Sequence, residues 1–372
     1  MKGFTTPQFP DSPKPRVEVQ KLHAYKAPLE GRRKLLRLDF NENTIGPSPL
    51  VVKAIRNIPS NHISIYPEYN GLRETLIESL ISGKSYANLS IDQVGVFNGV
   101  DAAIHSIFHA YGDRGNQLVT TSPTFGYYTP CAHMQGMEII SIPYVGVEMR
   151  FPLQRVKNAV KKHKPKLLLI CNPNNPTGTR LEPQKIMELA AISPNTLIVV
   201  DELYEAFTGD SVLPIVDFNK AQNLLILRSL SKTAGLAGLR IGFAIGNSDV
   251  IDKISRVTGP YDVNSFAVTA ALAALKDQDY IDAYVQEVLQ AKDWIKHQLI
   301  NNKVRHHIDG GNYFLLWPKR ESSEVEASLR AADILVRDMK GKSLIEGALR
   351  VSIGTTEQMN HFWKSFSSID LI

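Results

Sequence analysis

Four short polar segments contain side chains that could do chemistry together, and each lies next to a run of apolar residues. The segments are Asn172–Gly178, Asp201–Tyr204, Arg228–Lys232 and Gly238–Gly242. The first three follow apolar runs that predict buried strands, and the fourth leads into another such run. Because the loops at the carboxyl ends of strands meet at one edge of an open α/β sheet, where ligands bind, we expect the four segments to form one site.

The side chains in these segments meet the needs of an aldehyde cofactor that has a pyridine ring, a ring hydroxyl and a phosphate. Lys232 supplies the amine that would hold the aldehyde as a Schiff base. A buried carboxylate at Asp201 would raise the pKa of the pyridine nitrogen and keep it protonated, so that the ring acts as an electron sink. Asn175 and Tyr204 could donate hydrogen bonds to the ring hydroxyl. Two hydroxyls and a guanidinium suit a phosphate, and they come from Ser229, Ser231 and Arg240.

Each of these residues has a more ordinary explanation when it is taken alone. An aspartate at a strand end usually caps a helix or a turn. A single lysine or arginine usually lies at the surface, and a tyrosine more often packs in or beside the core than against a ligand. It is the combination, in this order and with every member beside a predicted strand, that favours a functional site.

Competing motifs have less support. Ser229–Lys232 fits the S-x-x-K of penicillin-recognising hydrolases, but the S-D-N and K-T-G motifs of those enzymes do not occur. Gly341-Lys342-Ser343 ends like a phosphate-binding loop, but Val336 stands where the first glycine is required. Neither G-x-G-x-x-G nor H-E-x-x-H is present, so the sequence carries no signature of a dinucleotide site or a zinc protease.

Composition and charge narrow the class of protein. The 372 residues are 43% hydrophobic and 21% charged, which predicts a globular chain with two domains. The net charge is +5, but the basic residues are scattered apart from Lys161–Lys166, which we interpret as a solvated loop before a buried strand. Nucleic-acid binding is therefore not expected, and the positive charge suits small anionic ligands equally well.

The cysteines and the N-terminus indicate the cellular setting. Two cysteines, Cys131 and Cys171, are too few for a disulfide framework or a cysteine-rich zinc site, and we expect no metal. No apolar run is long enough for a transmembrane helix. Residues Met1–Arg16 are rich in proline and polar side chains and do not match a secretory signal. We therefore expect a cytoplasmic protein with no membrane partner.

The chemistry-bearing segments need a sheet to hold them, and the apolar runs predict one. Strands of a mainly parallel sheet are predicted at Gln117–Thr121, Leu167–Cys171, Thr196–Val200, Asn223–Leu227 and Ile241–Ile245. Apolar residues at helical spacing predict one amphipathic helix, through Leu72, Leu76 and Leu80. They predict a second, longer helix from about Tyr280 to Leu299.

A change of pattern after the long helix predicts a second, smaller domain. Strands are predicted at Asn312–Trp317, Ile334–Val336 and Leu349–Ile353, around one helix. We expect the N-terminal segment to complete this α+β domain. The predicted division gives residues 1–44 to an N-terminal arm and part of the small domain, residues 45–279 to the large domain, and residues 280–372 to the rest of the small domain.

Taken together, these features resemble the fold-type I enzymes that use pyridoxal 5′-phosphate (PLP), and within them the histidinol-phosphate aminotransferase group. The resemblance extends from about Leu22 to Thr356. Besides the four segments above, it is carried by Asp39–Asn43, Tyr66-Pro67-Glu68, Asn98–Asp101, Pro123-Thr124-Phe125, Pro260–Asn264 and Leu349–Ser352. It implies an α/β fold with a mostly parallel, seven-stranded sheet in the large domain, and PLP as the cofactor.

The resemblance also implies roles for residues outside the four segments. Val100 and Asp101 would contact the phosphate of PLP, and Phe125 would stack on its ring. Tyr66 would reach the cofactor's phosphate in a partner subunit, which implies a homodimer with shared sites. The residues implied in substrate binding are Arg350, Arg337, Tyr25 and Asn43. The implied catalytic residues are Lys232, Asp201 and Tyr204.

The implied activity is transfer of an amino group between histidinol phosphate, or an aromatic or related amino acid, and 2-oxoglutarate. Departures from the family pattern leave the amino donor open: Ala102 stands where a glutamate is frequent, Ser229 where a threonine is frequent and Leu203 where an alanine is common. One alternative is a PLP-dependent decarboxylase of a phosphorylated amino acid such as threonine phosphate. Another is a non-catalytic PLP-binding regulator, but such proteins usually carry a DNA-binding module, for which we expect no room before Leu22.

Overall fold

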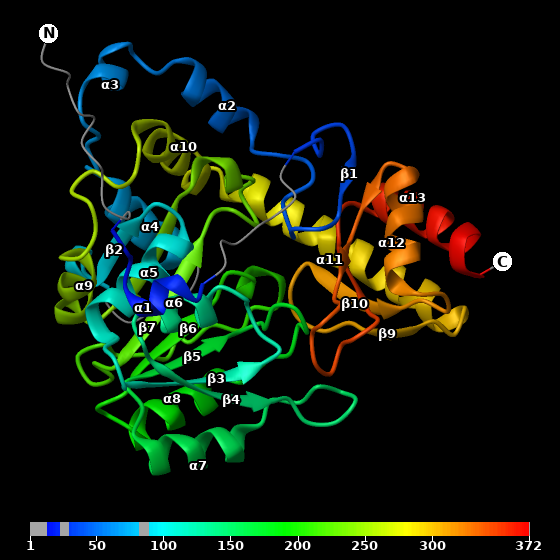
Figure 1. The fold of residues 1–372 in the computed structure, drawn as a ribbon. Coiled ribbons are helices and arrows are strands. Elements are labelled where there is room, and N and C mark those ends of the chain that lie inside the picture. Colours follow the sequence, from blue (N-terminus) through cyan, green and yellow to red (C-terminus); the bar gives the residue numbers. More distant parts are fainter. Residues whose placement is uncertain (1–12, 23–29, 82–88, 372) are drawn as a thin grey trace, which may run out of the picture.

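The structure, a computed structural model, describes residues 13–22, 30–81 and 89–371. A seven-stranded sheet with helices on both faces forms one part of the molecule (Figure 1). A second group of strands and helices, drawn in orange and red, lies beside it (Figure 1). The long helix α11 (Gln278–Asn301) runs from the first part into the second. It confirms the long helix predicted from about Tyr280 to Leu299.

The large sheet is mostly parallel. Its strands lie in the order β2-β8-β7-β6-β5-β3-β4. Neighbours from β7 to β4 pair in parallel, whereas β8 pairs antiparallel with both β2 and β7. The bounds are β2 (Val94–Phe97), β3 (Gln117–Ser122), β4 (Glu138–Pro143), β5 (Leu167–Cys171), β6 (Leu197–Asp201), β7 (Leu224–Ser229) and β8 (Gly242–Gly246). The predicted α/β fold class with a seven-stranded sheet is confirmed.

The five strands predicted for this sheet are all present, and their ends differ from the prediction by at most two residues. Strands β2 and β4 were not predicted from the apolar runs. Strand β2 has only four residues and includes Gly95, so it is too short to stand out as an apolar run. Strand β4 lies at the edge of the sheet, where Glu138 and Ser141 are exposed, so it lacks the continuous apolar character of a buried strand.

Alternate side chains of the central strands fill two separate layers of core. On one face, Leu169 and Val199 pack against α5 and α6. On the other face, Ile170 and Val200 pack against α7 and α8. Because helices cover both faces, each central strand is apolar throughout, which is why its run could be recognised. The covering helices are α5 (Val100–Tyr111), α6 (Tyr128–Met134), α7 (Leu153–His163), α8 (Pro183–Ile192) and α9 (Ser248–Ser255).

Five further helices lie outside these two layers, four of them in the N-terminal part of the described chain. They are α1 (Val17–Gln20), α2 (Pro49–Arg56), α3 (Asn61–Ser64), α4 (Leu72–Ile81) and α10 (Ser265–Leu275). Helix α4 confirms the amphipathic helix predicted through Leu72, Leu76 and Leu80. Short 3-10 turns occur at Ile91–Gln93, Glu205–Phe207 and Ala237–Leu239.

The smaller part combines the C-terminal strands with one N-terminal strand. Strand β1 (Leu36–Arg37) pairs in parallel with β11 (Ile334–Leu335), so an N-terminal strand lies beside a C-terminal one. A four-stranded antiparallel sheet has the order β12-β13-β10-β9. Its bounds are β9 (Arg305–His307), β10 (Tyr313–Trp317), β12 (Arg337–Asp338) and β13 (Leu349–Ser352). The exact limits of the two domains, at residues 44 and 279, stay a prediction.

The prediction of a single helix among these strands is wrong. Helix α12 (Ser322–Ala331) is followed by a second helix, α13 (Thr356–Phe366), and a π-helical turn at Ser367–Leu371. Helix α13 begins with a capping box, in which the Thr355 hydroxyl accepts from the backbone N–H of Gln358 and the Gln358 side chain accepts from the backbone N–H of Thr355. The sequence from Thr355 to Gln358 therefore carries a helix-start signal, which apolar spacing alone does not reveal.

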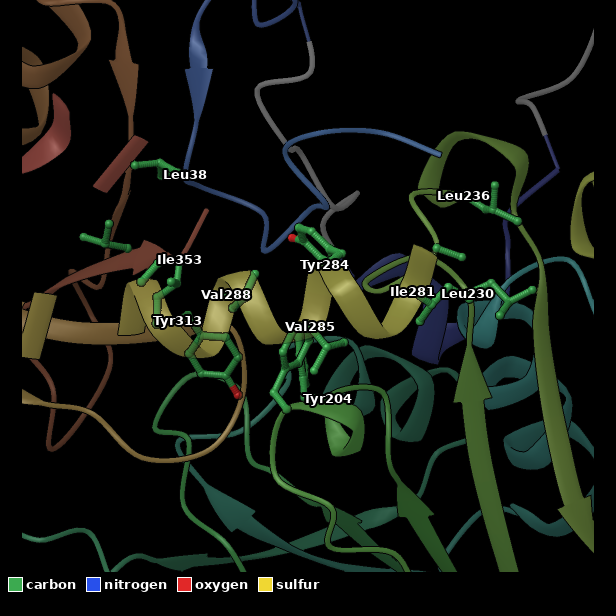
Figure 2. Close-up of a cluster of buried hydrophobic side chains, with 14 of the residues drawn as sticks. Leu38, Tyr204, Leu230, Leu236, Ile281, Tyr284, Val285, Val288, Tyr313 and Ile353 are labelled. Carbon is green, nitrogen blue, oxygen red and sulfur yellow. The ribbon is translucent and has the colours of Figure 1, made fainter. Parts of the chain in front are cut away.

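One hydrophobic cluster joins the two parts along helix α11. Figure 2 shows Tyr284 and Val288 on this helix, with Tyr204 of the large part and Tyr313 of the small part below it, and the rings of these two tyrosines meet edge to face with centres 5.0 Å apart. All four side chains are buried. The position of Tyr204 is therefore fixed by core packing as well as by its hydrogen bonds. No helix within the described ranges is both long and apolar enough to cross a membrane.

The loop that contains Gly178 lies so close to the turn at Gly310 that a side chain at position 178 should not fit. Gly178 has φ +77°, and a Cβ there would lie 2.7 Å from the carbonyl oxygen of Gly310. Gly209 has nearly the same φ, +75°, but a Cβ there would meet no atom within 4 Å. We expect Gly209→Ala to lower the free energy of unfolding by about 1–2 kcal/mol, the cost of the left-handed conformation. Gly178→Ala should cost at least about 1 kcal/mol more, because overpacking adds to the same strain.

Denaturant unfolding of the two variants measures this difference. Equal losses for Gly178→Ala and Gly209→Ala would show that the approach of the 172–179 loop to the Gly310 turn is not a tight constraint.

Candidate active site

The carboxyl ends of β5, β6 and β7 place the predicted segments side by side. Cys171 is the register partner of Asp201, and Asp201 is the partner of Leu227. The loop that begins at Asn172, the carboxylate of Asp201 and the Ser229–Lys232 segment therefore lie at one edge of the sheet. The fourth segment also reaches this edge, because Gly242 in β8 pairs with Ser229.

Asp201 is a buried carboxylate with two hydrogen-bond donors. Its side chain lies at the end of β6 and the residue is 4% exposed. The Tyr128 hydroxyl donates to Oδ2 at 2.6 Å, and the backbone N–H of Leu203 donates to Oδ1 at 3.3 Å. Burial raises the pKa of Asp201 to about 6, although both hydrogen bonds act in the opposite direction. Such a carboxylate is suited to a cationic partner such as a protonated pyridine nitrogen.

Lys232 is an amine held beside the backbone of Phe40 and the ring of Tyr204. Its Nζ donates to the carbonyl oxygen of Phe40 at 3.0 Å and lies 5.9 Å from the centre of the Tyr204 ring. Burial, and then the positive charge of Arg350, lower the pKa of Lys232 to about 8. The neutral amine, which a nucleophile or a base requires, thus becomes the main form above a pH of about 8 rather than above the usual lysine pKa.

Tyr204 lies at the centre of a network of side-chain amides. Its hydroxyl accepts from Asn41 Nδ2 at 3.1 Å and from Asn175 Nδ2 at 3.3 Å, so its own proton is free to be donated. Arg350 Nη1 donates to Asn175 Oδ1 at 2.6 Å, and Nη2 donates to the carbonyl of Asp39 at 2.5 Å. Burial lowers the pKa of Arg350. The buried Nε of Arg350 has no hydrogen-bond partner within the described residues, so one donor of this guanidinium is unsatisfied.

The residues expected at a phosphate gather near the N-terminus of α5. Val100 is the first residue of this helix. Arg240 Nη2 forms an ion pair with Asp101 Oδ2 at 2.7 Å. The backbone N–H of Ser231 donates to Ser229 Oγ at 3.0 Å, and the two hydroxyls lie 2.9 Å apart. A helix N-terminus with hydroxyls and a guanidinium is a favourable place for a phosphate.

Close backbone packing explains the glycines around this cradle. A Cβ on Gly99, which has φ +78°, would lie 2.5 Å from Arg240 Nη2. A Cβ on Gly242 would lie 2.5 Å from the backbone nitrogen of Val100. Any larger residue at either position would displace the guanidinium or the start of α5.

The residues at this edge of the sheet can be matched to PLP group by group. The cradle at α5 matches its phosphate, Asp201 matches its ring nitrogen, the free O–H of Tyr204 matches its ring oxygen, and Lys232 matches its aldehyde. The half-buried ring of Phe125 lies on the same side, with its centre 5.5 Å from that of Tyr128. The donor set therefore fits the cofactor.

The proposed substrate residues differ in their surroundings. Arg337 is the register partner of Arg350, and its guanidinium carbon lies 5.8 Å from the centre of the Phe40 ring. The side chain of Asn43 is occupied by backbone groups: it donates to the carbonyl of Thr233 at 2.8 Å and accepts from the N–H groups of Ile45 and Gly46. These bonds form a turn, and its contact with substrate stays a prediction.

Two tyrosines lie away from the site or outside the described residues. Tyr66 is 71% exposed and stacks on Tyr261, with ring centres 4.1 Å apart. It therefore faces outward from its own chain. Tyr25 lies outside the described residues.

Three residues that support the site were not predicted from the sequence. Tyr128 contacts Asp201, Asn41 contacts Tyr204, and Arg32 pairs with the side chains of Asp39 and Glu42. Asn41 belongs to a segment that carried the resemblance, and Tyr128 follows Phe125 by three residues. Both residues therefore lie in or near segments that the sequence had singled out, but nothing in the sequence indicated that their side chains would contact the site.

Comparison with known proteins agrees with this geometry. The model of the family "aminotransferase class I and II" matches residues 33–366. The histidinol-phosphate aminotransferase of Geotalea uraniireducens is 31% identical, covering 90% of this chain and 92% of the relative. That of Moorella thermoacetica is 32% identical, covering 91% of this chain and 86% of the relative.

Solved structures share the fold. The histidinol-phosphate aminotransferase of Sinorhizobium meliloti in complex with PLP has a TM-score of 0.82 at 24% identity, covering 95% of this chain and 97% of that chain. The L-threonine-O-3-phosphate decarboxylase of Porphyromonas gingivalis has a TM-score of 0.77 at 25% identity, covering 90% of this chain and 99% of that chain. With the family match and the fitted donor set, this chain belongs to the aminotransferase class I and II family and is a PLP-dependent aminotransferase.

Proposed function

We propose that this aminotransferase moves an amino group between histidinol phosphate and 2-oxoglutarate. The observation that carries the proposal is the pairing of Arg337 and Arg350 on neighbouring strands β12 and β13, with Arg337 over the ring of Phe40, the residue whose carbonyl accepts from Lys232. Two guanidinium groups held side by side suit a doubly charged phosphate better than a single carboxylate. The names of the relatives from Geotalea uraniireducens and Moorella thermoacetica support the same donor.

Arg350 would also have to bind the carboxylate of the amino acceptor. Its Nε is free of partners among the described residues, and its Nη groups are fixed by Asn175 and by the backbone of Asp39, so the guanidinium has a defined orientation. We expect phosphate in one half-reaction and carboxylate in the other to occupy this position in turn.

The roles of the other residues follow from their surroundings. PLP, when bound, supplies a protonated pyridine ring that delocalises the negative charge left by loss of a proton from the substrate's α-carbon. Lys232 Nζ, with its lowered pKa, removes that proton and carries it. Asp201 holds a proton on the ring nitrogen. Tyr204 donates to the ring oxygen and is itself fixed by Asn41 and Asn175.

Two alternatives from the sequence are not favoured. The L-threonine-O-3-phosphate decarboxylase of Porphyromonas gingivalis is 25% identical to this chain, whereas the aminotransferases of Geotalea uraniireducens and Moorella thermoacetica are 31% and 32% identical. Release of carbon dioxide without an amino acceptor would identify a decarboxylase. A regulator without catalysis would bind PLP but fail to convert it with any amine.

We propose in addition that the protein is a homodimer in which Tyr66 reaches the partner's cofactor phosphate. Tyr66 lies in an exposed group of large apolar side chains, which is unusual for a surface that remains in water. Ile63 and Ile65, which precede it in the chain, are exposed, and so is Tyr261, on which it stacks. The expected cytoplasmic location stays a prediction.

The lowered pKa of Lys232 predicts how cofactor uptake depends on pH. Only the neutral amine attacks an aldehyde, so the rate of PLP uptake by cofactor-free protein should rise as the pH increases through about 8. Arg350→Gln should move this midpoint upward, because removing a nearby positive charge raises the pKa of Lys232. Stopped-flow absorbance of the bound cofactor measures the rate.

Lys292 provides a matched control for that measurement. Burial also lowers its pKa to about 8, but it lies in α11 and donates to the carbonyl oxygens of Asp309 and Gly311. Lys292→Met should leave the pH profile unchanged, whereas Lys232→Ala should abolish uptake through the amine. An identical profile in Arg350→Gln and the unmodified protein would contradict the assigned cause.

The arginine pair predicts a loss that depends on the substrate's phosphate. Arg337→Gln should raise KM for histidinol phosphate by about tenfold or more, the value of a charge-assisted hydrogen bond, while activity with non-phosphorylated histidinol stays the same. Arg305→Gln is the control, because Arg305 lies in the same sheet but packs on Trp317. Steady-state kinetics with both donors give the answer. Equal losses with and without the phosphate would argue against histidinol phosphate.

Mixed dimers test the position of Tyr66. A Lys232→Ala chain paired with a Tyr66→Phe chain should contain one complete site, because the chain that keeps Lys232 would receive Tyr66 from its partner. That site should hold PLP as tightly as the unmodified protein does. A chain with both substitutions, paired with Tyr66→Phe, is the control and should not restore tight binding. If the first hybrid also fails to restore it, Tyr66 does not act across subunits.

A further inference from the structure

We propose that Tyr128 is a positioning residue that fixes both the carboxylate and the aromatic ring facing the cofactor. Its hydroxyl would keep Asp201 ionised, and its ring would hold Phe125 in place. The proposal rests on the PLP site alone and not on the identity of the amino donor.

The geometry links Tyr128 to both neighbours. Tyr128 is the first residue of α6 and is 1% exposed. Its hydroxyl donates to Asp201 Oδ2 at 2.6 Å. Its ring meets that of Phe125 edge to face, with centres 5.5 Å apart and planes at 82°. The side chain of Tyr128 thus contacts both Asp201, which would face the ring nitrogen of the cofactor, and Phe125, which would stack on the ring.

Core packing alone would not require a hydroxyl at this position. Tyr128 lies in the hydrophobic layer that includes Leu169, Val199 and Leu227, where phenylalanine would fill nearly the same volume. A buried hydroxyl is costly unless it is hydrogen-bonded. This hydroxyl donates to Asp201. The bond satisfies both the buried hydroxyl, which needs an acceptor, and the buried carboxylate, which needs a donor.

The hydroxyl remains a donor throughout the working pH range. Complete burial, and the negative charge of Asp201, raise the pKa of Tyr128 well above its usual value. Tyr128 therefore does not compete with Asp201 to become the anion.

The other groups that act on Asp201 do not replace this donor. The backbone N–H of Leu203 donates to the opposite oxygen at 3.3 Å, and the thiol of Cys171 lies alongside. Two charges act from further away: Asp101 raises the pKa of Asp201 and Lys232 lowers it. Tyr128 supplies the shorter of the two hydrogen bonds, and burial dominates the balance.

The hydrogen bond from Tyr128 to Asp201 Oδ2 influences whether a shared proton lies on Asp201 or on the cofactor. The carboxylate of Asp201 and a pyridine nitrogen opposite it are two bases that compete for the same proton. A hydrogen bond that stabilises the carboxylate as an anion makes it a weaker base. The proton then stays on the ring nitrogen, where the electron sink requires it.

Tyr128→Phe tests the hydroxyl without removing the ring. In cofactor-free protein with ¹³C-labelled aspartate, the pKa of the Asp201 carboxyl should rise by at least about one unit, the effect of losing one hydrogen bond to a charged group. A spectrum of Asp201→Asn identifies the Asp201 signal. In the same variant, the Kd for PLP at pH 7.5 should increase about tenfold.

Tyr127→Phe is the matched control. The adjacent phenol of Tyr127 interacts with Cys131 rather than with Asp201, so this variant should leave both the Asp201 pKa and the Kd for PLP unchanged. Tyr128→Leu removes ring and hydroxyl together and should weaken PLP binding beyond Tyr128→Phe, because Phe125 also loses its support. Thermal unfolding of each variant confirms that it is folded.

The possible results test the role of Tyr128 independently of the proposed amino donor. An Asp201 pKa that is the same in Tyr128→Phe and the unmodified protein overturns the electrostatic role. Equal PLP affinity in Tyr128→Phe and Tyr128→Leu overturns the support of Phe125. Neither measurement uses an amino donor, so a failure to convert histidinol phosphate would leave both results standing.

Discussion

Burial of the Asp201 carboxylate is the constraint to which the rest of the site responds. A carboxylate at the end of a central strand loses its hydration, and its pKa rises to about 6 as a result. A charge in that position is stable only where donors and a cationic partner compensate for the lost water. Tyr128 and the backbone of Leu203 supply the donors, and a protonated pyridine ring would supply the cation. The carboxylate thereby selects a cofactor that brings its own positive charge.

The N-terminal segment around Phe40 contacts three residues of this site. The carbonyl of Asp39 accepts from Arg350, and the carbonyl of Phe40 accepts from Lys232. Asn41 has φ +54° and donates to Tyr204, while its backbone N–H donates to Ser352. Three successive residues thus contact one cation, one amine and one phenol.

A buried ion pair anchors that segment from the other side. Arg32 binds Asp39 through two hydrogen bonds, at 2.6 and 3.0 Å, and also binds Glu42. The strained backbone of Asn41 can persist because the pair holds both of its flanks. The site consequently depends on residues whose own side chains never face the cofactor.

Residues at strand ends could be predicted from the sequence, whereas residues that act through another side chain could not. Lys232 and Asp201 follow apolar runs that identify buried strands, and the topology then places their loops at one edge of the sheet. Tyr128 sits among ordinary core residues, and only its distance from Asp201 reveals its role. The contact between Asn41 and Ser352 spans 311 positions, so no local pattern could indicate it.

The balance of charge predicts that the site favours anionic substrates. Four cationic side chains belong to it, namely Lys232, Arg240, Arg337 and Arg350, whereas Asp101 and Asp201 are carboxylates of the same site. Arg32 and Arg37 are neutralised by Asp39 and Glu42 and so add nothing to this excess. The cofactor phosphate would compensate part of it at Arg240. The charges of Arg337 and Arg350 remain, and because Arg350 is buried, they attract a substrate that carries a phosphate or a carboxylate more strongly than exposed arginines would.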